Sequence, residues 1–290
     1  MALQIGGYEL AEVLGTGSRT TVYLGKHRFV PGLQAAVKVL HPNLAKLDQV
    51  RDELRREAAL LARLRHPHIV RVLDFIEDGE LCALVVELIE GPSLRELLED
   101  QSEVISVRRV LRIFRTLTEA LAHAHGLGLS HGQLDPSVIV ISERDEVKLL
   151  DFGSVRAGTG DIAAENRPYL VPERGSQDLT ADPGDDIYSL ARLGEALLLG
   201  REVRARQASP AALDEAGAPA GFIELLRVMA HQDPRQRIGS CGEVLAALDR
   251  LSGSSINRAP LELLDLGHCQ VDLARGEVRS GAQRDSLTTN

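Results

Sequence analysis

The spacing of hydrophobic positions changes along the chain, from the alternation typical of strands to the spacing typical of helices. In the first part, alternating or apolar runs bounded by turn residues predict strands over 8–14, 20–25, 35–40, 70–77 and 81–88. Within this part, residues 48–64 carry hydrophobic side chains at helical spacing, and His66-Pro67 ends the predicted helix. We therefore expect a strand-rich first part that contains one helix.

After Gly91-Pro92 the hydrophobic spacing becomes helical. Helices are predicted over 93–98, 107–125, 185–199, 222–231 and 241–251, with a short pair of strands within 130–152. The segment 205–221 is rich in Ala, Gly and Pro, which predicts a flexible connection. The predicted fold class is α+β, with a small β-rich lobe over about residues 1–90, a larger helical lobe over 91–252, and a cleft between them.

The composition shifts again at Ser252-Gly253-Ser254-Ser255, which predicts a linker over 253–260. Residues 261–290 return to short strand-like runs at 261–266, 269–273 and 277–279. A segment of this length is too small to bury a core of its own. We therefore expect the chain to end inside a further β-rich domain.

Composition places the chain among ordinary globular proteins, since 44% of its residues are hydrophobic and 26% are charged. The net charge of −9 gives no basic field that would attract nucleic acid. The three cysteines, Cys82, Cys241 and Cys269, lie far apart, which argues against a disulfide scaffold and against a cysteine zinc site. The longest uncharged stretch, 120–134, is too short and too polar to cross a bilayer, and no signal peptide is evident. We expect a cytoplasmic protein with no membrane partner.

Residues suited to phosphate binding occur in the first part of the chain. Gly15 and Gly17 lie in the turn between two predicted strands, where backbone N–H groups could approach phosphates, and Val22 could cover a base. Lys38 lies on the next strand and Glu57 on the following helix, and a lysine oriented by a glutamate suits phosphate positioning. Taken singly, these features also fit a hairpin turn and a structural pair that ties the helix to the strand.

The order and spacing of these and later motifs are those of a known family. The chain from Tyr8 to Leu251 resembles a eukaryotic-type Ser/Thr protein kinase domain of the kind found in bacteria. The resemblance implies a two-lobed kinase fold with a nucleotide in the cleft. It is carried, in chain order, by the glycine loop, Ala36-Val37-Lys38, Glu57, His66-Pro67-His68-Ile69-Val70, Val85-Val86-Glu87-Leu88, His131, Asp151-Phe152-Gly153, Val171-Pro172-Glu173, Asp186-Ile187-Tyr188-Ser189-Leu190 and Asp233-Pro234 through Arg237.

The resemblance implies a role for each residue at a matching position. Lys38 would reach the α- and β-phosphates of ATP or ADP, Glu57 would orient it, and Asp151 would hold one Mg²⁺. The residues that would enclose or contact adenine are Val22, Ala36, Glu87, Ile89 and Val140. The implied structural residues are Asp186 and an ion pair formed by Glu173 and Arg237.

The catalytic loop, residues 131–138, departs from the family pattern His-Arg-Asp-x-Lys-Pro-x-x-Asn. Gln133 stands where the family has its base, and an amide cannot accept a hydroxyl proton at neutral pH. Asp135 replaces the lysine that steadies the transferring phosphate, and we expect it to put a negative charge beside that phosphate. Val138 replaces the asparagine that holds a second Mg²⁺ and offers no ligand oxygen. These changes predict a pseudokinase.

Three further departures agree with lost phosphotransfer. Thr20 replaces the third glycine of the glycine loop, and Gly132 replaces an arginine that would hold a phosphorylated activation loop. Asn166 replaces a threonine.

Our interpretation is a nucleotide-binding pseudokinase that serves as a sensory or scaffolding module of a larger regulatory protein. Its partners would be its own downstream domain and other proteins. The alternatives are an active Ser/Thr kinase with Asp135 as a relocated base, and a protein-interaction module with a nucleotide-free cleft.

The tail has a separate resemblance. Residues 264–273, 276–279 and 287–289 are similar to the opening strands of a bacterial response-regulator winged-helix domain. DNA contact would then need the recognition helix of that domain, which this chain does not include. The alternative is an ordinary β-rich extension that packs against the kinase-like lobe.

Overall fold

The computed structural model describes residues 3–100, 105–152, 165–173, 182–203 and 207–256, together with four strands between residues 263 and 286. The chain divides into two compact units, Met1–Leu245 and Ala246–Asn290. Each unit is described by itself.

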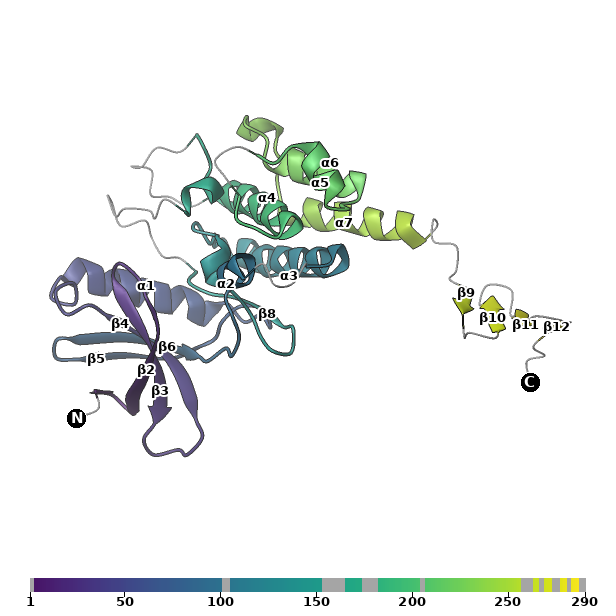
Figure 1. The fold of residues 1–290 in the computed structure, drawn as a ribbon. Coiled ribbons are helices and arrows are strands. Elements are labelled where there is room, and N and C mark those ends of the chain that lie inside the picture. The colour runs from purple at the N-terminus through teal and green to yellow at the C-terminus, as the bar shows by residue number, and fades with distance from the viewer. Residues whose placement is uncertain are drawn as a thin grey trace. The chain divides into compact units, whose positions relative to one another are not determined.

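The first unit opens with a six-stranded sheet in the order β1-β2-β3-β4-β6-β5 (Figure 1). All of its pairings are antiparallel. The strands are β1 (Gln4–Ile5), β2 (Tyr8–Thr16), β3 (Thr20–His27), β4 (Gln34–Leu40), β5 (Val72–Asp78) and β6 (Leu81–Glu87). The bounds of β2 to β6 agree with the predicted strands to within a few residues, because the alternation of apolar and polar positions marks these strands clearly. Strand β1 was not predicted, since two residues are too few to show an alternating pattern.

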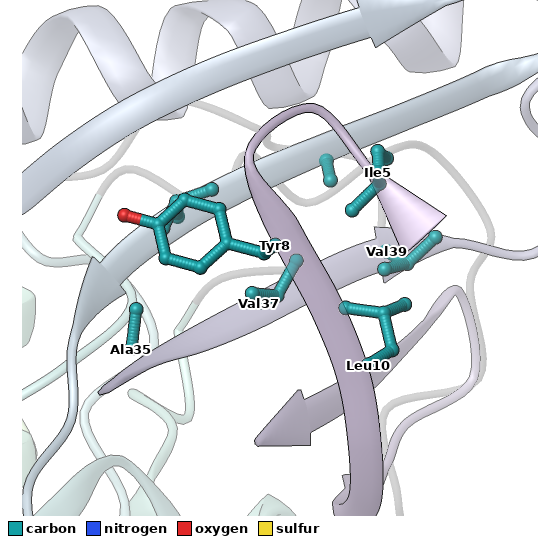
Figure 2. Packing of buried hydrophobic residues seen from close by; sticks show 8 residues of the cluster. Ile5, Tyr8, Leu10, Ala35, Val37 and Val39 are labelled. Carbon is teal, nitrogen blue, oxygen red and sulfur yellow. The ribbon is translucent and has the colours of Figure 1, made fainter. Parts of the chain in front are cut away.

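Strand β4 shows how the sheet positions functional residues. Ala35, Val37 and Val39 are buried in a cluster with Ile5, Tyr8 and Leu10 (Figure 2). Since successive side chains of a strand point to opposite faces, Lys38 lies on the other face from this cluster. The hydrophobic face of β4 therefore fixes the direction in which Lys38 points.

Helix α1 (Asp48–Arg63) packs against β5 and β6. Its buried positions recur at helical spacing, and two of them are the glutamates Glu53 and Glu57. A buried carboxylate needs a partner, since burial without one is costly. The buried glutamates of α1 therefore point to cations on neighbouring elements.

The rest of the first unit is mainly helical. The helices are α2 (Leu94–Glu99), α3 (Val107–Gly126), α4 (Pro183–Leu199), α5 (Pro210–Glu215), α6 (Ala220–Met229) and α7 (Cys241–Ile256), whose last turns belong to the second unit. Strands β7 (Ile139–Ile141) and β8 (Val147–Leu149) form a separate two-stranded sheet. Helix α4 is buried along most of its length and packs against α3 and α6. It forms the centre of the helical lobe.

Two predictions about connecting segments need correction. The segment 205–221, predicted as a flexible connection, contains helix α5, because the Ser209 side chain accepts a hydrogen bond from the Ala212 N–H and Pro210 suits the first turn. The linker predicted over 253–260 begins inside α7, which continues to Ile256. A glycine costs a helix interior about 1 kcal/mol, which alone does not end a helix. Residues 257–260 lie outside the described part of the chain.

The second unit contains an antiparallel sheet in the order β12-β11-β10-β9. Its strands are β9 (Leu263–Asp265), β10 (Cys269–Asp272), β11 (Glu277–Ser280) and β12 (Gln283–Ser286). The first three fall on predicted strand-like runs. Strand β12 was not predicted, because it has no apolar residue to give an alternating pattern. Across the residues that the structure describes, no helix combines the length and the apolar character needed to cross a membrane.

Candidate functional site

A pocket of about 200 Å³, here the main pocket, lies where the β2–β3 loop, β4, α1 and the catalytic loop meet. Both lobes of the first unit contribute to it. It is lined by Gly17, Ser18, Arg19, Thr20, Lys38, Leu40, Val50, Glu53, Leu54, Glu57, Gln133 and Asp151. Three carboxylates and two cations among these residues make the lining strongly charged.

Lys38 is at the centre of the charges in the main pocket. Its Nζ lies 2.9 Å from Glu57 Oε1 and 2.8 Å from Asp151 Oδ1. Burial alone would lower the pKa of Lys38, but the carboxylates of Asp151 and Glu57 outweigh burial and raise it. Lys38 is therefore a permanent cation that joins the β-rich lobe to the segment after β8.

Asp151 adopts a left-handed backbone conformation, with φ of 55°. This conformation is uncommon for residues other than glycine and is seen at functional sites where surrounding contacts maintain it. Burial would raise the pKa of Asp151, but the ammonium of Lys38 outweighs it and lowers the pKa, so the side chain is a carboxylate. The next residue, Phe152, is buried against the His131 ring at 4.7 Å between centroids. Gly153, the last residue of the Asp-Phe-Gly motif, lies outside the described residues.

Gly15 near the end of β2 and Gly17 in the β2–β3 loop leave room above the backbone. Among the described residues, a Cβ at Gly15 would meet no atom within 4 Å beyond its chain neighbours, and one at Gly17 would lie 3.7 Å from the Thr20 carbonyl oxygen. The internal packing of the protein therefore does not require glycine at either position. A ligand that approaches the backbone closely would require it.

The residues predicted to contact adenine lie on the expected elements but outside the main pocket. Val22 on β3 pairs with Lys38, and Ala36 on β4 pairs with Val86. Glu87, Ile89 and Val140 are half-buried, as are Val22 and Ala36. The main pocket therefore corresponds to the predicted phosphate end of the site, and the adenine contacts stay a prediction.

Glu87 has structural contacts that the sequence did not predict. Its Oε1 accepts hydrogen bonds from Lys148 Nζ at 2.7 Å and from the Arg71 N–H at 3.0 Å. Its own N–H donates to the Arg71 carbonyl at 2.9 Å. The side chain of Glu87 thus ties the end of β6 to β8, across the two lobes.

Gly91 follows this connection and approaches the helical lobe closely. It has φ of 149°, and a Cβ there would lie 2.2 Å from the Ile141 carbonyl oxygen. The Ile141 N–H donates to the Pro92 carbonyl at 3.0 Å. Only glycine fits this position, which fixes the segment between the lobes against β7.

The backbone of the catalytic loop is held by Asp186, in the first turn of α4. This buried carboxylate accepts hydrogen bonds from the N–H groups of His131 and Gly132, each at 2.8 Å. His125 Nε2 lies 2.8 Å from its Oδ2. Gly132 has φ of 82°, a left-handed conformation that glycine adopts without strain. Asp186 therefore lies where the family resemblance places a structural residue.

Asp135 does not line the main pocket, and the expectation that it puts its charge beside a transferring phosphate stays a prediction. Its Oδ1 accepts hydrogen bonds from the Ser137 N–H at 2.7 Å and the Ser137 hydroxyl at 2.6 Å, capping the 3-10 turn Pro136–Val138. The side chain is buried and lines a separate hollow of about 20 Å³, together with Gln133, Leu134, Asn166, Tyr169 and Leu170. Serine and arginine donors hold the carboxylate there.

The arginine donor is Arg95 of α2, which the sequence analysis did not single out. Its Nη2 lies 3.4 Å from Asp135 Oδ1 and 2.5 Å from Asn166 Oδ1, and its Nη1 pairs with Glu202. Arg95 thus joins α2, the catalytic loop, the segment around Asn166 and the end of α4. No local pattern signals these contacts, because their partners are far apart in the sequence.

The structure also describes Val138 and an ion pair between Glu173 and Arg237. Val138 is buried and has no side-chain oxygen to offer a metal ion. Arg237 Nη2 lies 2.8 Å from Glu173 Oε2, and its guanidinium lies over the Tyr188 ring at 4.9 Å. The pair therefore anchors the segment after residue 171 to the helical lobe.

Cys241, His125 and Asp186 form a chain of contacts in the order of a nucleophilic triad. Cys241 Sγ lies 3.6 Å from His125 Nδ1. Cys241 is buried, however, and burial raises the pKa of its thiol to about 12. A thiol that neither ionises nor meets solvent is not a nucleophile, so this chain is structural.

Metal-binding groups are sparse in the site. Within the described ranges, no group of three or more His, Cys, Asp or Glu side chains is arranged to hold a metal ion. Asp151 is the carboxylate that the resemblance assigns to Mg²⁺, and it already contacts Lys38. A metal ion here would therefore need further oxygen ligands from a bound phosphate or from water.

Comparisons with known proteins agree with this geometry. The family model described as "Protein kinase domain" matches residues 8–247. The serine/threonine-protein kinase pkn2 of Myxococcus xanthus is 31% identical over 271 residues, which cover 84% of this chain and 32% of pkn2. The serine/threonine-protein kinase PknB of Mycolicibacterium smegmatis is 31% identical over 310 aligned positions, covering 97% of this chain and 48% of PknB. The chain thus spans about a third to a half of the length of these relatives.

Among solved structures, the chain is similar to the PknI kinase domain of Mycobacterium tuberculosis. The TM-score is 0.68 at 30% sequence identity, and the match covers 86% of this chain and 98% of that domain. Both lobes described above therefore have a counterpart in a crystal structure.

Proposed function

The chain belongs to the protein kinase family, and from that membership we propose that it is a pseudokinase that binds ATP or ADP without transferring phosphate. In this proposal the domain is a sensory or scaffolding module of a larger bacterial regulatory protein. Nucleotide occupancy is its signal, and its partners are its own downstream domain and other proteins.

The observation that carries the proposal is that Gln133 lines the main pocket. The family resemblance assigns the catalytic base to its position in the sequence. A positioned base contributes about 10²–10⁴-fold to such a reaction, and an amide cannot replace it. The three carboxylates in the main pocket are each paired with a cation, Glu53 with Arg19 and both Glu57 and Asp151 with Lys38. These ion pairs occupy the carboxylates, and the ammonium of Lys38 lowers the pKa of Asp151, which makes Asp151 a weak proton acceptor.

Nucleotide binding is supported by the groups that the main pocket retains. Lys38 offers a cation to the α- and β-phosphates, and the space above Gly15 and Gly17 allows backbone contact. One Mg²⁺, which would neutralise phosphate charge, would take Asp151 as its protein ligand. Val138 removes the side-chain oxygen that a second ion would need.

The second candidate function is a weakly active Ser/Thr kinase. The observation that favours it is the Lys38–Glu57 pair, together with the contact between Lys38 and Asp151, since active kinases need both groups in place. Its base would have to be Asp135, which is engaged by Ser137 and Arg95. We favour the pseudokinase for that reason.

A combined assay separates these functions. The purified chain is incubated with radiolabelled Mg·ATP, alone and with a generic basic substrate protein, while thermal unfolding is recorded with ATP, ADP and no nucleotide. We expect nucleotide to raise the melting temperature by mass action. We expect turnover below about 0.1 s⁻¹, against roughly 1–100 s⁻¹ for active kinases.

Activity above that limit contradicts the pseudokinase, and its loss in Asp135→Asn would identify the relocated base. A melting temperature that neither ATP nor ADP changes, at millimolar concentration with Mg²⁺, contradicts nucleotide binding. That result would support the nucleotide-free interaction module.

A further inference from the structure

The β2–β3 loop brings a second cation into the main pocket. Arg19 forms an ion pair with Glu53 of α1, and both residues line the pocket beside Lys38, Glu57 and Asp151. The Glu53 side chain is nearly buried, with 9% of it exposed, whereas 34% of the Arg19 side chain is exposed. The pair thus joins the tip of the loop to α1.

The backbone of Arg19 is fixed, so its side chain is the part that can change partner. The Arg19 carbonyl accepts a hydrogen bond from the His41 N–H at 2.9 Å, and Thr20 pairs with Leu40 in the sheet. Glu53 has a second donor, since Gln49 Nε2 lies 3.4 Å from its Oε1. Glu53 would therefore keep a hydrogen bond if the guanidinium turned away.

The charges of the main pocket are unfavourable for a polyphosphate while the Arg19–Glu53 pair is closed. Lys38 is shared between two carboxylates and Arg19 is neutralised by a third, which leaves one negative charge in excess among the lining residues. A guanidinium matches phosphate geometry with two parallel hydrogen bonds, and such charged bonds are among the strongest in proteins. A phosphate group therefore competes effectively with Glu53 for Arg19.

We propose that Arg19 is a second phosphate-binding residue, and that its ion pair with Glu53 is a latch that the terminal phosphates of a nucleoside di- or triphosphate displace. This inference rests on the proposed nucleotide binding and adds a recognition residue to it. Arg19 supplies the cation that the catalytic loop lacks, since Asp135 stands in place of a lysine and lies outside the main pocket. Opening the latch also breaks the ion pair between the β2–β3 loop and α1. Binding of a nucleotide would therefore change the contacts of α1, a helix of the β-rich lobe.

The test measures affinities of ATP, ADP and adenosine by calorimetry, without Mg²⁺ and with it, for the full chain and five variants. Arg19→Ala should weaken ATP and ADP about tenfold or more, the size expected of a charge-assisted contact, and should leave adenosine unchanged within about twofold. Glu53→Gln should tighten ATP and ADP by roughly two- to fivefold, because it removes the competing carboxylate and keeps the side-chain shape. Arg28→Ala is the matched control, since it removes one exposed arginine away from the main pocket.

Each outcome decides one point. Unchanged ATP and ADP affinity in Arg19→Ala, with binding still lost in Lys38→Ala, overturns the role of Arg19 and leaves the proposed function intact. Weaker binding in both Arg19→Ala and Glu53→Gln shows that the pair maintains the shape of the loop, which overturns the latch. Absence of ATP and ADP binding in the unmodified chain overturns the inference together with the proposed function. Arg19→Lys should recover part of the affinity, since the charge returns without the two-pronged geometry.

Discussion

The main pocket and the catalytic loop are neighbours, yet their charged residues are used differently. In the main pocket, Lys38 and Arg19 form direct ion pairs with carboxylates from other elements, and all of these residues line the cavity. In the catalytic loop, Asp135 is buried and occupied by Ser137 and Arg95. The first arrangement can exchange one of its partners for a ligand, whereas the second is part of the packing. The comparison shows that neighbouring parts of one site differ in how firmly their charged side chains are held by the surrounding structure.

The largest effect is expected from removing Lys38. Lys38→Ala leaves Glu57 and Asp151 without their shared cation, and breaking a buried ion pair on one side costs about 3–5 kcal/mol. We expect a large drop in melting temperature and loss of ATP and ADP binding. Lys46→Ala is the control, because Lys46 forms an exposed pair with Glu80 and should change neither. Nucleotide binding that survives in Lys38→Ala would place the phosphates elsewhere.

The next effect concerns restoring the catalytic loop. Gln133→Asp, Asp135→Lys and Val138→Asn together should raise phosphotransfer about 10²-fold over the parent, because the missing groups act as a unit. Single changes should do little. The measurement is radiolabelled autophosphorylation, with adenosine affinity as a check on folding. If the triple variant binds ATP but transfers phosphate no faster than the parent, the segment around Asn166 is what prevents phosphotransfer.

A smaller effect should separate the structural role of Asp135 from an electrostatic one. Asp135→Ala removes the cap of the turn Pro136–Val138 and should cost about 1 kcal/mol of unfolding free energy. Because Asp135 lies outside the main pocket, the ratio of ATP to ADP affinity should stay unchanged. Ser137→Ala is a useful companion, since it removes one of the three hydrogen bonds to the same carboxylate. A shift of the ratio toward ATP in Asp135→Ala would show that its charge reaches the phosphates after all.

The smallest effect is a pH dependence at the contact between His66 and His123, whose rings stack at 5.3 Å. Burial lowers the pKa of His66, and the neighbouring His123, His68 and Lys148 lower it further. Since the folded pKa lies below the unfolded value, the unfolded state binds the proton more readily, and stability falls as pH drops below about 6.5. We expect denaturant unfolding between pH 7.5 and 5.5 to show less loss of stability in His66→Gln than in the parent. An equal loss in both would assign the dependence to other groups.

The sequence predicted most elements of the fold, because alternation and helical spacing are local patterns. It also predicted the residues that meet at Lys38, through their resemblance to a family in which Glu57 and Asp151 occupy the same positions. The ion pairs of Arg19 with Glu53 and of Arg95 with Asp135 were not predicted, since each joins elements that are distant along the chain. Helix α5 was missed because its Ser-Pro start lies within an Ala-rich stretch that also fits a loop. Local sequence patterns thus predict the helices and strands, whereas the packing of these elements determines which charged side chains form ion pairs.

The anchoring of the catalytic loop by Asp186 has a consequence for substitutions in the loop. Because this carboxylate binds main-chain N–H groups of His131 and Gly132, the shape of the loop start does not depend on the side chains that follow it. Since these two hydrogen bonds use no side chain of the loop, a substitution at the neighbouring position Gln133 leaves both in place. A change of residue there can therefore alter the chemistry of the main pocket while the start of the loop keeps its anchor.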